Sequence, residues 1–147
     1  MTDIKYGWHI LPGNGMLNYG GKVKLRNNVW YSVKGYIDMC NNGLHASKTL
    51  RGAVRYWYYA NVGMGDSSAY ICRVAFKGDI SLNPSKYDDE YNWDHFNMSK
   101  YVARSRKIIW RIPAEKIVSM GYSSSTASIR KTAIRIAKKL DVYREDK

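Results

Sequence analysis

The first half of the chain alternates short apolar runs with turn-forming residues, a pattern typical of β-strands. Tyr6–Leu11 is a compact aromatic and β-branched run that is followed at once by proline and glycine. Asn27 and Asn28 stand between two further short runs, and because this pair tolerates positive φ the arrangement predicts a hairpin. Residues 36–40 predict another short strand, which leads into the segment MCNNGLHAS at residues 39–47.

Two longer apolar runs in the second half predict the main strands of a sheet. Residues 68–82 are apolar on both sides of the predicted strand, which favours a central position, and Gly78 predicts a bulge or bend. Residues 100–113 predict either two short strands or one bent strand, ended by a proline. Residues 114–118 are expected to complete the sheet.

After Ser47 the spacing of apolar residues changes from two to three or four, as on one face of a helix. The residues on this face are Leu50, Ala53, Val54, Trp57 and Ala60. Either Ser47 or Thr49 is available as the N-cap, and we expect Arg51 and Arg55 on the wetter side of the helix.

A second amphipathic helix is predicted at the C-terminus, over residues 123–143. Its apolar stripe consists of Ile129, Ala133, Ile136, Ala137 and Leu140. Its other face carries the basic residues Arg130, Lys131, Arg135, Lys138 and Lys139. Such a face is commonly a solvated surface, but five positive charges also make it the best candidate for contact with a polyanion.

Together these elements predict one α+β domain over residues 1–147. We expect a compact, mostly antiparallel sheet with one helix after the second strand motif and a basic amphipathic C-terminal helix. Residues 6–118 form the core of this domain. Residues 83–98 contain four acidic and four aromatic residues without clear periodicity, so we expect a long surface loop.

The composition adds a strong positive charge. The chain has 24 Lys and Arg against 12 Asp and Glu, and residues 98–147 account for +9 of the net charge of +12. Such a surface attracts polyanions. Because no apolar run is long enough for a membrane span and no export signal precedes the first strand, we expect a soluble cytoplasmic protein. We also expect Cys40 and Cys72 to be buried free thiols.

Several common patterns of metal sites and enzymes are absent from the sequence. The histidines His9, His45 and His95 and the two cysteines do not have the spacing of a zinc site, so no metal is expected. There is also no GxxxxGK loop, no GxSxG elbow and no dinucleotide glycine fingerprint. The sequence retains two histidine motifs, GWH at residues 7–9 and GLHAS at residues 43–47.

The order of these motifs resembles a small, uncharacterised domain family of phages and bacteria. Members of this family contain GWH, then CxxGLHAS, a helix with a tyrosine, RVxxxGxI and KYVAxxR. The matching segments here are Gly7-Trp8-His9, Cys40–Ser47, Tyr56, Arg73–Ile80 and Lys100–Arg106. The resemblance covers roughly residues 6–118 and implies a phage-type accessory protein that acts in a bacterial host cell.

More remotely, the same order resembles the ADP-ribosyltransferase fold, which the RNA 2'-phosphotransferases share. That resemblance implies that His9 holds the ribose of NAD or of an ADP-ribose derivative, and that His45 and Ser47 line the pocket. It also implies that Tyr56 stacks on the nicotinamide ring. Glu115 is the one candidate for the glutamate of such a site, and it can equally be the start of a helix.

Three functions are consistent with these features. The first is binding, with or without turnover, of an NAD-like or ADP-ribose-like nucleotide. The second is non-enzymatic binding of nucleic acid, or of the nucleic-acid channel of a bacterial defence complex, by the basic surface. The third is contact with a host protein through the acidic aromatic residues 87–96.

The position of the His45 side chain distinguishes between the first two hypotheses. If His45 shares a cleft with His9, the protein has a nucleotide site. If it packs under the helix that follows, the function lies on the basic and aromatic surface. A histidine between apolar residues of a strand also has a plain alternative, since it is commonly a hydrogen-bonded core residue.

Overall fold

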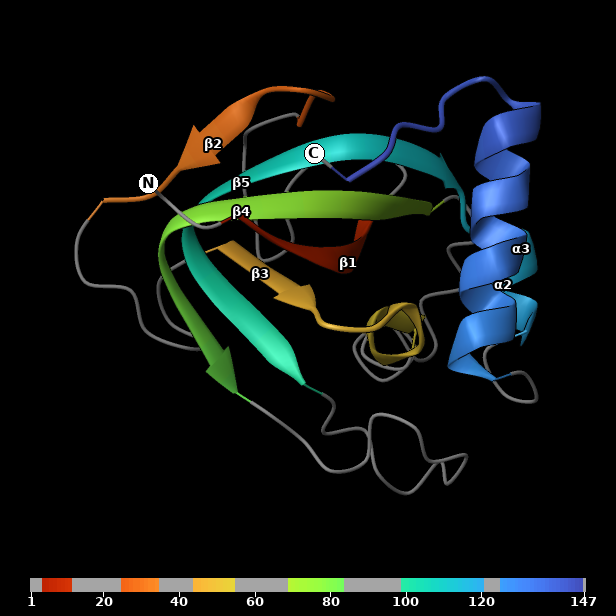
Figure 1. Ribbon diagram of the computed structural model, residues 1–147, viewed down its shortest axis with the longest axis horizontal. Helices are drawn as coiled ribbons and strands as arrows, with labels where there is room; N and C mark the ends of the chain where they lie inside the picture. Colours follow the sequence, from red (N-terminus) through yellow and green to blue (C-terminus); the bar gives the residue numbers. More distant parts are fainter. Residues whose placement is uncertain are drawn as a thin grey trace.

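A computed structural model describes residues 4–11, 25–34, 44–54, 69–83, 99–120 and 125–146. Figure 1 shows a five-stranded sheet with helices gathered at one of its ends. The expectation of an α+β fold with a mostly antiparallel sheet and a C-terminal helix is confirmed. The described helices include none that is long and apolar enough to cross a membrane.

The sheet is built around two long strands. The strands are β1 (Lys5–Leu11), β2 (Trp30–Ser32), β3 (Leu44–Ser47), β4 (Tyr70–Asn83) and β5 (Lys100–Pro113). Of the two alternatives for residues 100–113, one bent strand is therefore correct. The strand order is β2-β5-β3-β1-β4, and β4 pairs with β5 as well. Because β1, β4, β5 and β3 form a closed circuit of antiparallel pairs, the sheet rolls up on itself.

Irregular pairing between β4 and β5 produces the bend that this rolling requires. The register shifts between Arg73 and Val74, and again between Lys77 and Ile80. Gly78 lies inside the second shift with φ of 81°, a conformation that glycine adopts without strain. The predicted bulge or bend at Gly78 is confirmed, and β4 turns sharply near its end in Figure 1.

The rolled sheet separates two groups of buried residues. The inner cluster comes from the strands and one adjoining residue: Leu11, Leu25, Ala46, Cys72, Val74, Phe76, Ala103 and Ile108. The outer cluster joins the opposite face of the sheet to the helices, and its largest members are Trp8 and Trp110. Their rings meet edge to face with centroids 5.6 Å apart. A residue's position along a strand therefore decides which cluster its side chain enters.

The helix predicted after Ser47 begins as expected. Residues 50–54 are helical, and the Gly52 backbone N–H donates to Thr49 Oγ1 at 3.0 Å, so Thr49 is the N-cap of the two candidates. The expectation for Arg51 is wrong, because this residue is only 1% exposed. The rest of the predicted helix, including Arg55, lies outside the described residues.

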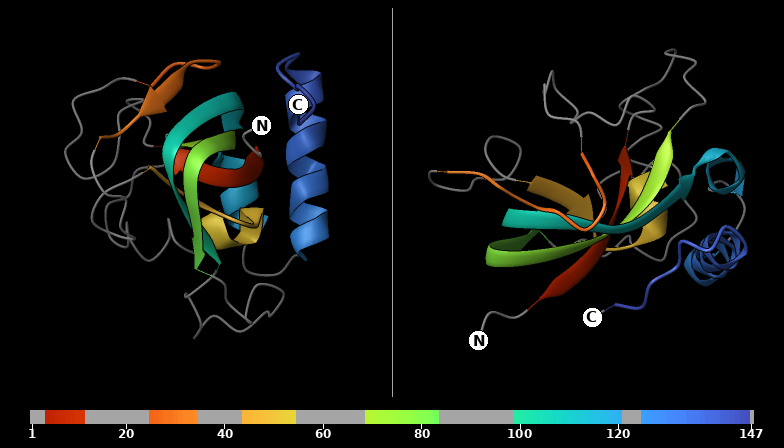
Figure 2. Two further views of the ribbon diagram at one scale, coloured as in Figure 1. Left: turned by 60° about the vertical axis from the view of Figure 1, so that its left-hand side comes forward. Right: turned by 90° about the horizontal axis from the view of Figure 1, so that it is seen from above.

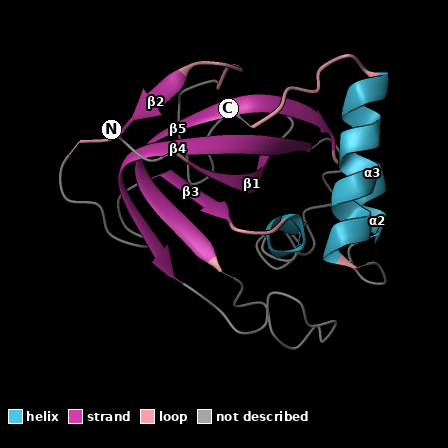
Figure 3. Ribbon diagram, viewed as in Figure 1, coloured by secondary structure: helices cyan, strands magenta, loops and turns pink. Residues whose placement is uncertain are grey.

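The C-terminal third corrects two further expectations. Residues 114–118 do not complete the sheet, because helix α2 (Glu115–Met120) begins there and buries Ile117. Helix α3 spans Thr126–Lys139, with Ser125 as its N-cap, and so ends four residues earlier than predicted. Figures 2 and 3 show α2 and α3 against one end of the sheet.

The apolar stripe of α3 is confirmed in part. Ile129, Ala133 and Ala137 are fully buried, whereas Leu140 is 51% exposed because the helix has already ended. Asp141 has φ of 59°, which turns the chain back, and Val142 donates from its N–H to Ala137 O at 2.9 Å. We call residues 142–146 the C-terminal tail.

Candidate functional site

His9 lies on β1, and its side chain points into the inner cluster. It pairs directly across the sheet with Cys72, a member of that cluster, and paired residues of antiparallel strands share a face. The His9 ring is partly exposed, yet its Nε2 atom is buried and has no hydrogen-bond partner. Burial lowers the pKa of His9 well below 6.5, and the charges of Arg106 and His45 lower it further. The imidazole is therefore neutral at neutral pH.

Each residue of the GWH motif occupies a distinct position in the structure. A Cβ added to Gly7 would lie 2.8 Å from Ser47 O, so glycine is what lets β1 approach β3 so closely. Trp8 is 2% exposed in the outer cluster. His9, one position further along the strand, points to the other face.

Arg106 on β5 brings a positive charge into the interior. It pairs with Phe76 of the inner cluster and is 4% exposed. Its Nη1 donates to His45 O at 2.6 Å, whereas its Nη2 is buried without a hydrogen-bond partner. Among the residues that the structure describes, no carboxylate pairs with it. Burial lowers the pKa of Arg106 to about 10, which leaves the guanidinium charged at neutral pH.

Cys72 contributes a thiol to the same interior. It lies between His9 on β1 and Arg111 on β5 in the strand register. Burial raises the pKa of Cys72 to about 12, although Arg106 and Arg111 both act to lower it. Cys72 is a free buried thiol, as predicted, and it stays protonated at neutral pH. Cys40, for which the same was predicted, lies outside the described residues.

The residues of the GLHAS motif divide between the two faces of β3. Ala46 belongs to the inner cluster, so its neighbours His45 and Ser47 point to the opposite face. Ser47 is 5% exposed, and the side chain of His45 is half-buried. His45 still reaches the interior through its carbonyl, which accepts the bond from Arg106.

The structure thus brings together only part of the predicted pocket. The His45 carbonyl accepts a bond from Arg106, whose charge also lowers the pKa of His9. The side chains of His45 and Ser47 face away from His9, so the two histidine side chains do not share a cleft. Tyr56 lies outside the described residues, as does the acidic aromatic segment 87–96. Glu115 is exposed in the first turn of α2, which fits its alternative role at a helix start. We call Arg106, His9, Cys72 and the His45 carbonyl the inner cationic site.

The basic residues of α3 are all exposed. They are Arg130, Lys131, Arg135, Lys138 and Lys139. Two of them contact the C-terminal tail. Arg130 Nη2 lies 3.9 Å from Asp146 Oδ2, with its guanidinium 5.9 Å from the Trp8 ring centroid of β1, and Lys138 Nζ lies 5.1 Å from the Tyr143 ring centroid. The other three, Lys131, Arg135 and Lys139, are exposed on the helix surface.

The sequence analysis assigned no role to Arg106 and Arg73, although they stand in the motifs KYVAxxR and RVxxxGxI. Arg73 is 6% exposed on the outer face, where its Nε donates to Asp146 Oδ1 at 3.1 Å and its guanidinium covers the Trp8 ring at 4.7 Å. The sequence does indicate that Arg106 faces the interior, because it stands two positions before the apolar Ile108 on the same predicted strand. Arg73 is similarly flanked by apolar residues in YICRVAF.

The described residues contain no group of three His, Cys, Asp or Glu side chains that could hold a metal ion. No protein-family model, curated protein or solved structure matches this chain. The function of the inner cationic site is therefore inferred from its own chemistry.

Proposed function

We propose that this protein acts by binding an anionic nucleotide, of the NAD or ADP-ribose kind, at the inner cationic site. The observation that carries the proposal is the guanidinium of Arg106, which is buried and charged and whose Nη2 has no hydrogen-bond partner. We place this activity in the cytoplasm of a bacterial host cell, as the resemblance to phage proteins implies.

The cost of the buried charge supports an anionic ligand. Removing an ion from water costs several kcal/mol unless an opposite charge and hydrogen bonds compensate it. For Arg106 the described part of the protein supplies one carbonyl, that of His45, and no counter-ion. A phosphate or pyrophosphate oxygen is a strong acceptor for the free Nη2, because charge-assisted bonds to guanidinium are short and directional.

His9 supports a ligand that also carries hydroxyl groups. A neutral imidazole offers one donor and one acceptor, and either suits a ribose hydroxyl. Its Nε2 is the second unpaired buried atom of the site, although the residue as a whole is partly exposed. The resemblance to the ADP-ribosyltransferase fold assigns the ribose to this same residue.

Isothermal titration calorimetry with ADP-ribose and NAD tests the proposal. The parent protein should bind, and Arg106→Gln should weaken binding by about tenfold or more, as expected for loss of a hydrogen bond to a charged group. Arg104→Gln is the matched control, because Arg104 lies on the same strand but pairs with Asp79 near the surface. Equal affinity of parent and Arg106→Gln, or no heat with millimolar ligand, refutes the proposal.

Two related probes identify the part of the nucleotide that is recognised. Adenosine retains a ribose but has no phosphate, and inorganic phosphate retains the anion alone. We expect adenosine to bind far more weakly than ADP-ribose, with phosphate competing weakly against ADP-ribose. Equal binding of adenosine and ADP-ribose argues against an anion at Arg106.

A second candidate is steric inhibition of a bacterial defence complex, by binding nucleic acid or its channel through α3. It is favoured by five exposed basic residues on a single helix and by the net charge of +12. Reversing the charges of Lys131, Arg135 and Lys139 to glutamate should abolish such binding, since these three extend away from the tail. Retained binding with no dependence on salt excludes this candidate.

A further inference from the structure

A row of side chains crosses four strands on the outer face of the sheet. Tyr6 of β1 pairs with Ala75 of β4, Ala75 pairs with Lys107 of β5, and Lys107 pairs with Trp30 of β2. Paired residues share a face, and Tyr6, Trp30 and Ala75 all pack with the outer cluster. Two aromatic rings therefore stand at the ends of one row, with a lysine between them. We call Tyr6, Lys77, Lys107 and Trp30 the aromatic face.

Cations lie against both rings of this face. Lys77 Nζ is 4.2 Å and Lys107 Nζ 5.0 Å from the Trp30 ring centroid, and Arg73 Cζ is 5.7 Å from that of Tyr6. Arg73 is neutralised by Asp146, but the structure gives Lys77 and Lys107 no ion pair with any residue it describes. The two lysines therefore leave a positive charge beside an aromatic ring.

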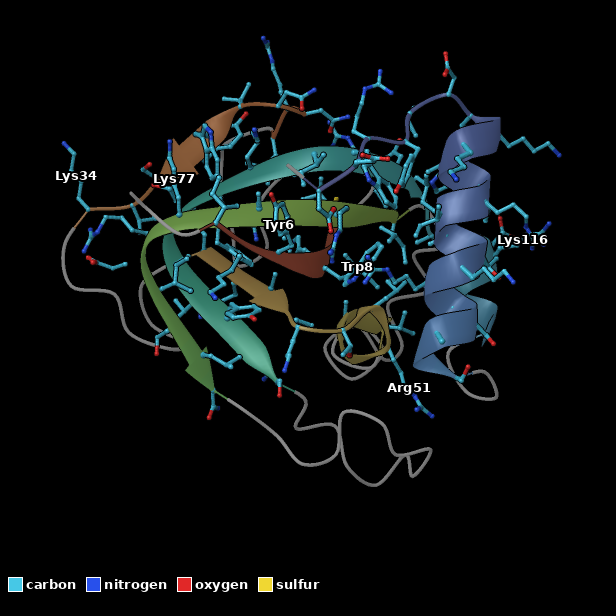
Figure 4. The ribbon with its side chains drawn as sticks, in the orientation of Figure 1. Tyr6, Trp8, Lys34, Arg51, Lys77 and Lys116 are labelled. Atoms are coloured by element: carbon cyan, nitrogen blue, oxygen red, sulfur yellow. The ribbon has the colours of Figure 1, made fainter. Side chains whose placement is uncertain are left out.

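The aromatic face lies away from the helices. Lys77 lies at the end of the sheet opposite helices α2 and α3, and Tyr6 lies nearer the middle of the sheet (Figure 4). All four side chains are partly exposed. Ala75 between them is 1% exposed, and its small side chain does not protrude above the sheet. Ile4, which precedes Tyr6 by two positions and so shares its side of β1, is 41% exposed.

We infer that the aromatic face binds single-stranded nucleic acid. Aromatic rings on a sheet stack with unpaired bases of any sequence, and adjacent lysines contact the phosphates. Tyr6 and Trp30 are separated by three strand spacings, or about 14 Å. This distance allows one base to stack on each ring, with the sugar-phosphate backbone of the nucleic acid passing over Lys107 between them. A duplex has no unstacked bases to offer, so the geometry favours single strands. This site lies on the opposite side of the sheet from Arg106 and does not depend on the proposed nucleotide.

Fluorescence anisotropy with labelled oligothymidine, oligouridine and a DNA duplex tests the inference. Trp30→Ala should weaken single-strand binding by about tenfold or more, and Trp30→Phe should keep most of the affinity. Lys77→Gln with Lys107→Gln should reduce the slope of log Kd against log salt by about 1.4. Thermal melts of each variant show whether it is folded, and the lysine variant alters no buried side chain.

The matched control removes two exposed charges outside both the aromatic face and α3, by Lys48→Gln with Lys116→Gln. It should leave the affinity and most of the salt slope unchanged. Tighter binding of the duplex than of single strands, or loss of binding in this control and not in the aromatic-face variants, overturns the inference. Absence of binding to either oligonucleotide at low salt overturns it as well, whatever the calorimetry with ADP-ribose gives.

Discussion

At the scale of single residues, the unpaired guanidinium of Arg106 implies a conflict between stability and binding. Arg106→Met replaces a buried charge by an apolar side chain of similar length. Because the charge lacks a counter-ion among the described residues, we expect the free energy of unfolding in urea to rise by about 1 kcal/mol. ADP-ribose binding should be lost in the same variant. A fall in stability of about 3 kcal/mol or more would instead mark Arg106 as a structural residue.

His9 predicts how stability depends on pH. Its pKa is held well below 6.5 in the folded protein, mainly by burial, whereas the unfolded chain protonates it near 6.5. The unfolded state therefore takes up more protons as the pH falls through 6.5, and folding stability decreases there, by at most about 1.4 kcal/mol per pH unit.

Urea unfolding of the parent and of His9→Gln, measured from neutral to mildly acidic pH, checks this expectation. The variant should lose most of the slope, because glutamine does not titrate. Parallel pH profiles of the two proteins would show that His9 is not responsible.

At the scale of elements, the C-terminal tail is held to the sheet by an ion pair. The side chain of Arg73 is 8% exposed and pairs with Asp146, and Trp110 Nε1 donates to Arg144 O at 3.0 Å. Asp146→Asn leaves Arg73 without its counter-ion, so we expect a loss of about 1–2 kcal/mol, reduced from the fully buried case because Asp146 is 30% exposed.

Asp141→Asn is the matched control for this loss in a thermal or urea melt. It removes the same charge from an exposed turn, and asparagine tolerates the φ of 59° at that position. Equal effects of the two substitutions would mean that the tail contributes only through net charge.

The elements also show how far the sequence predicts this fold. Runs of apolar, β-branched and aromatic residues correctly predicted β1 and β4, whose two faces are buried in different clusters. Three-to-four spacing predicted α3, which buries one face. Residues 114–118 were assigned to the sheet because Ile117 and Val118 favour strands, but packing of Ile117 against the helices decides the outcome. Leu140 was placed in the helix because nothing local predicts the turn at Asp141.

The inner cationic site was only partly predictable for a related reason. His9 was identified from its motif, but Arg106 was not, because an arginine on a strand is normally exposed. The register shift beside Arg73 places Ile108 in the inner cluster and Trp110 in the outer cluster, although they are two positions apart. The inward and outward alternation of side chains is therefore interrupted within β5. Closure of the sheet depends on long-range pairing, which a local pattern does not contain.

At the scale of the whole molecule, helix and sheet share one core. Ile129, Ala133 and Ala137 of α3 belong to the same outer cluster as Trp8 and Trp110. We therefore expect one cooperative unfolding transition. Tryptophan fluorescence, to which Trp8, Trp30 and Trp110 of the sheet contribute, should coincide with far-ultraviolet circular dichroism, which reports the helices as well. Separate transitions for the two signals would contradict the prediction of a single domain over residues 1–147.

The two faces of the rolled sheet carry the two proposed sites, and the central claim concerns the site in its interior. An NMR titration of arginine and histidine side-chain signals with ADP-ribose tests that claim most directly. The account predicts saturable shifts for Arg106 and His9 and none for Arg104. Saturable shifts confined to arginines on the surface, with Arg106 and His9 unmoved, would contradict it.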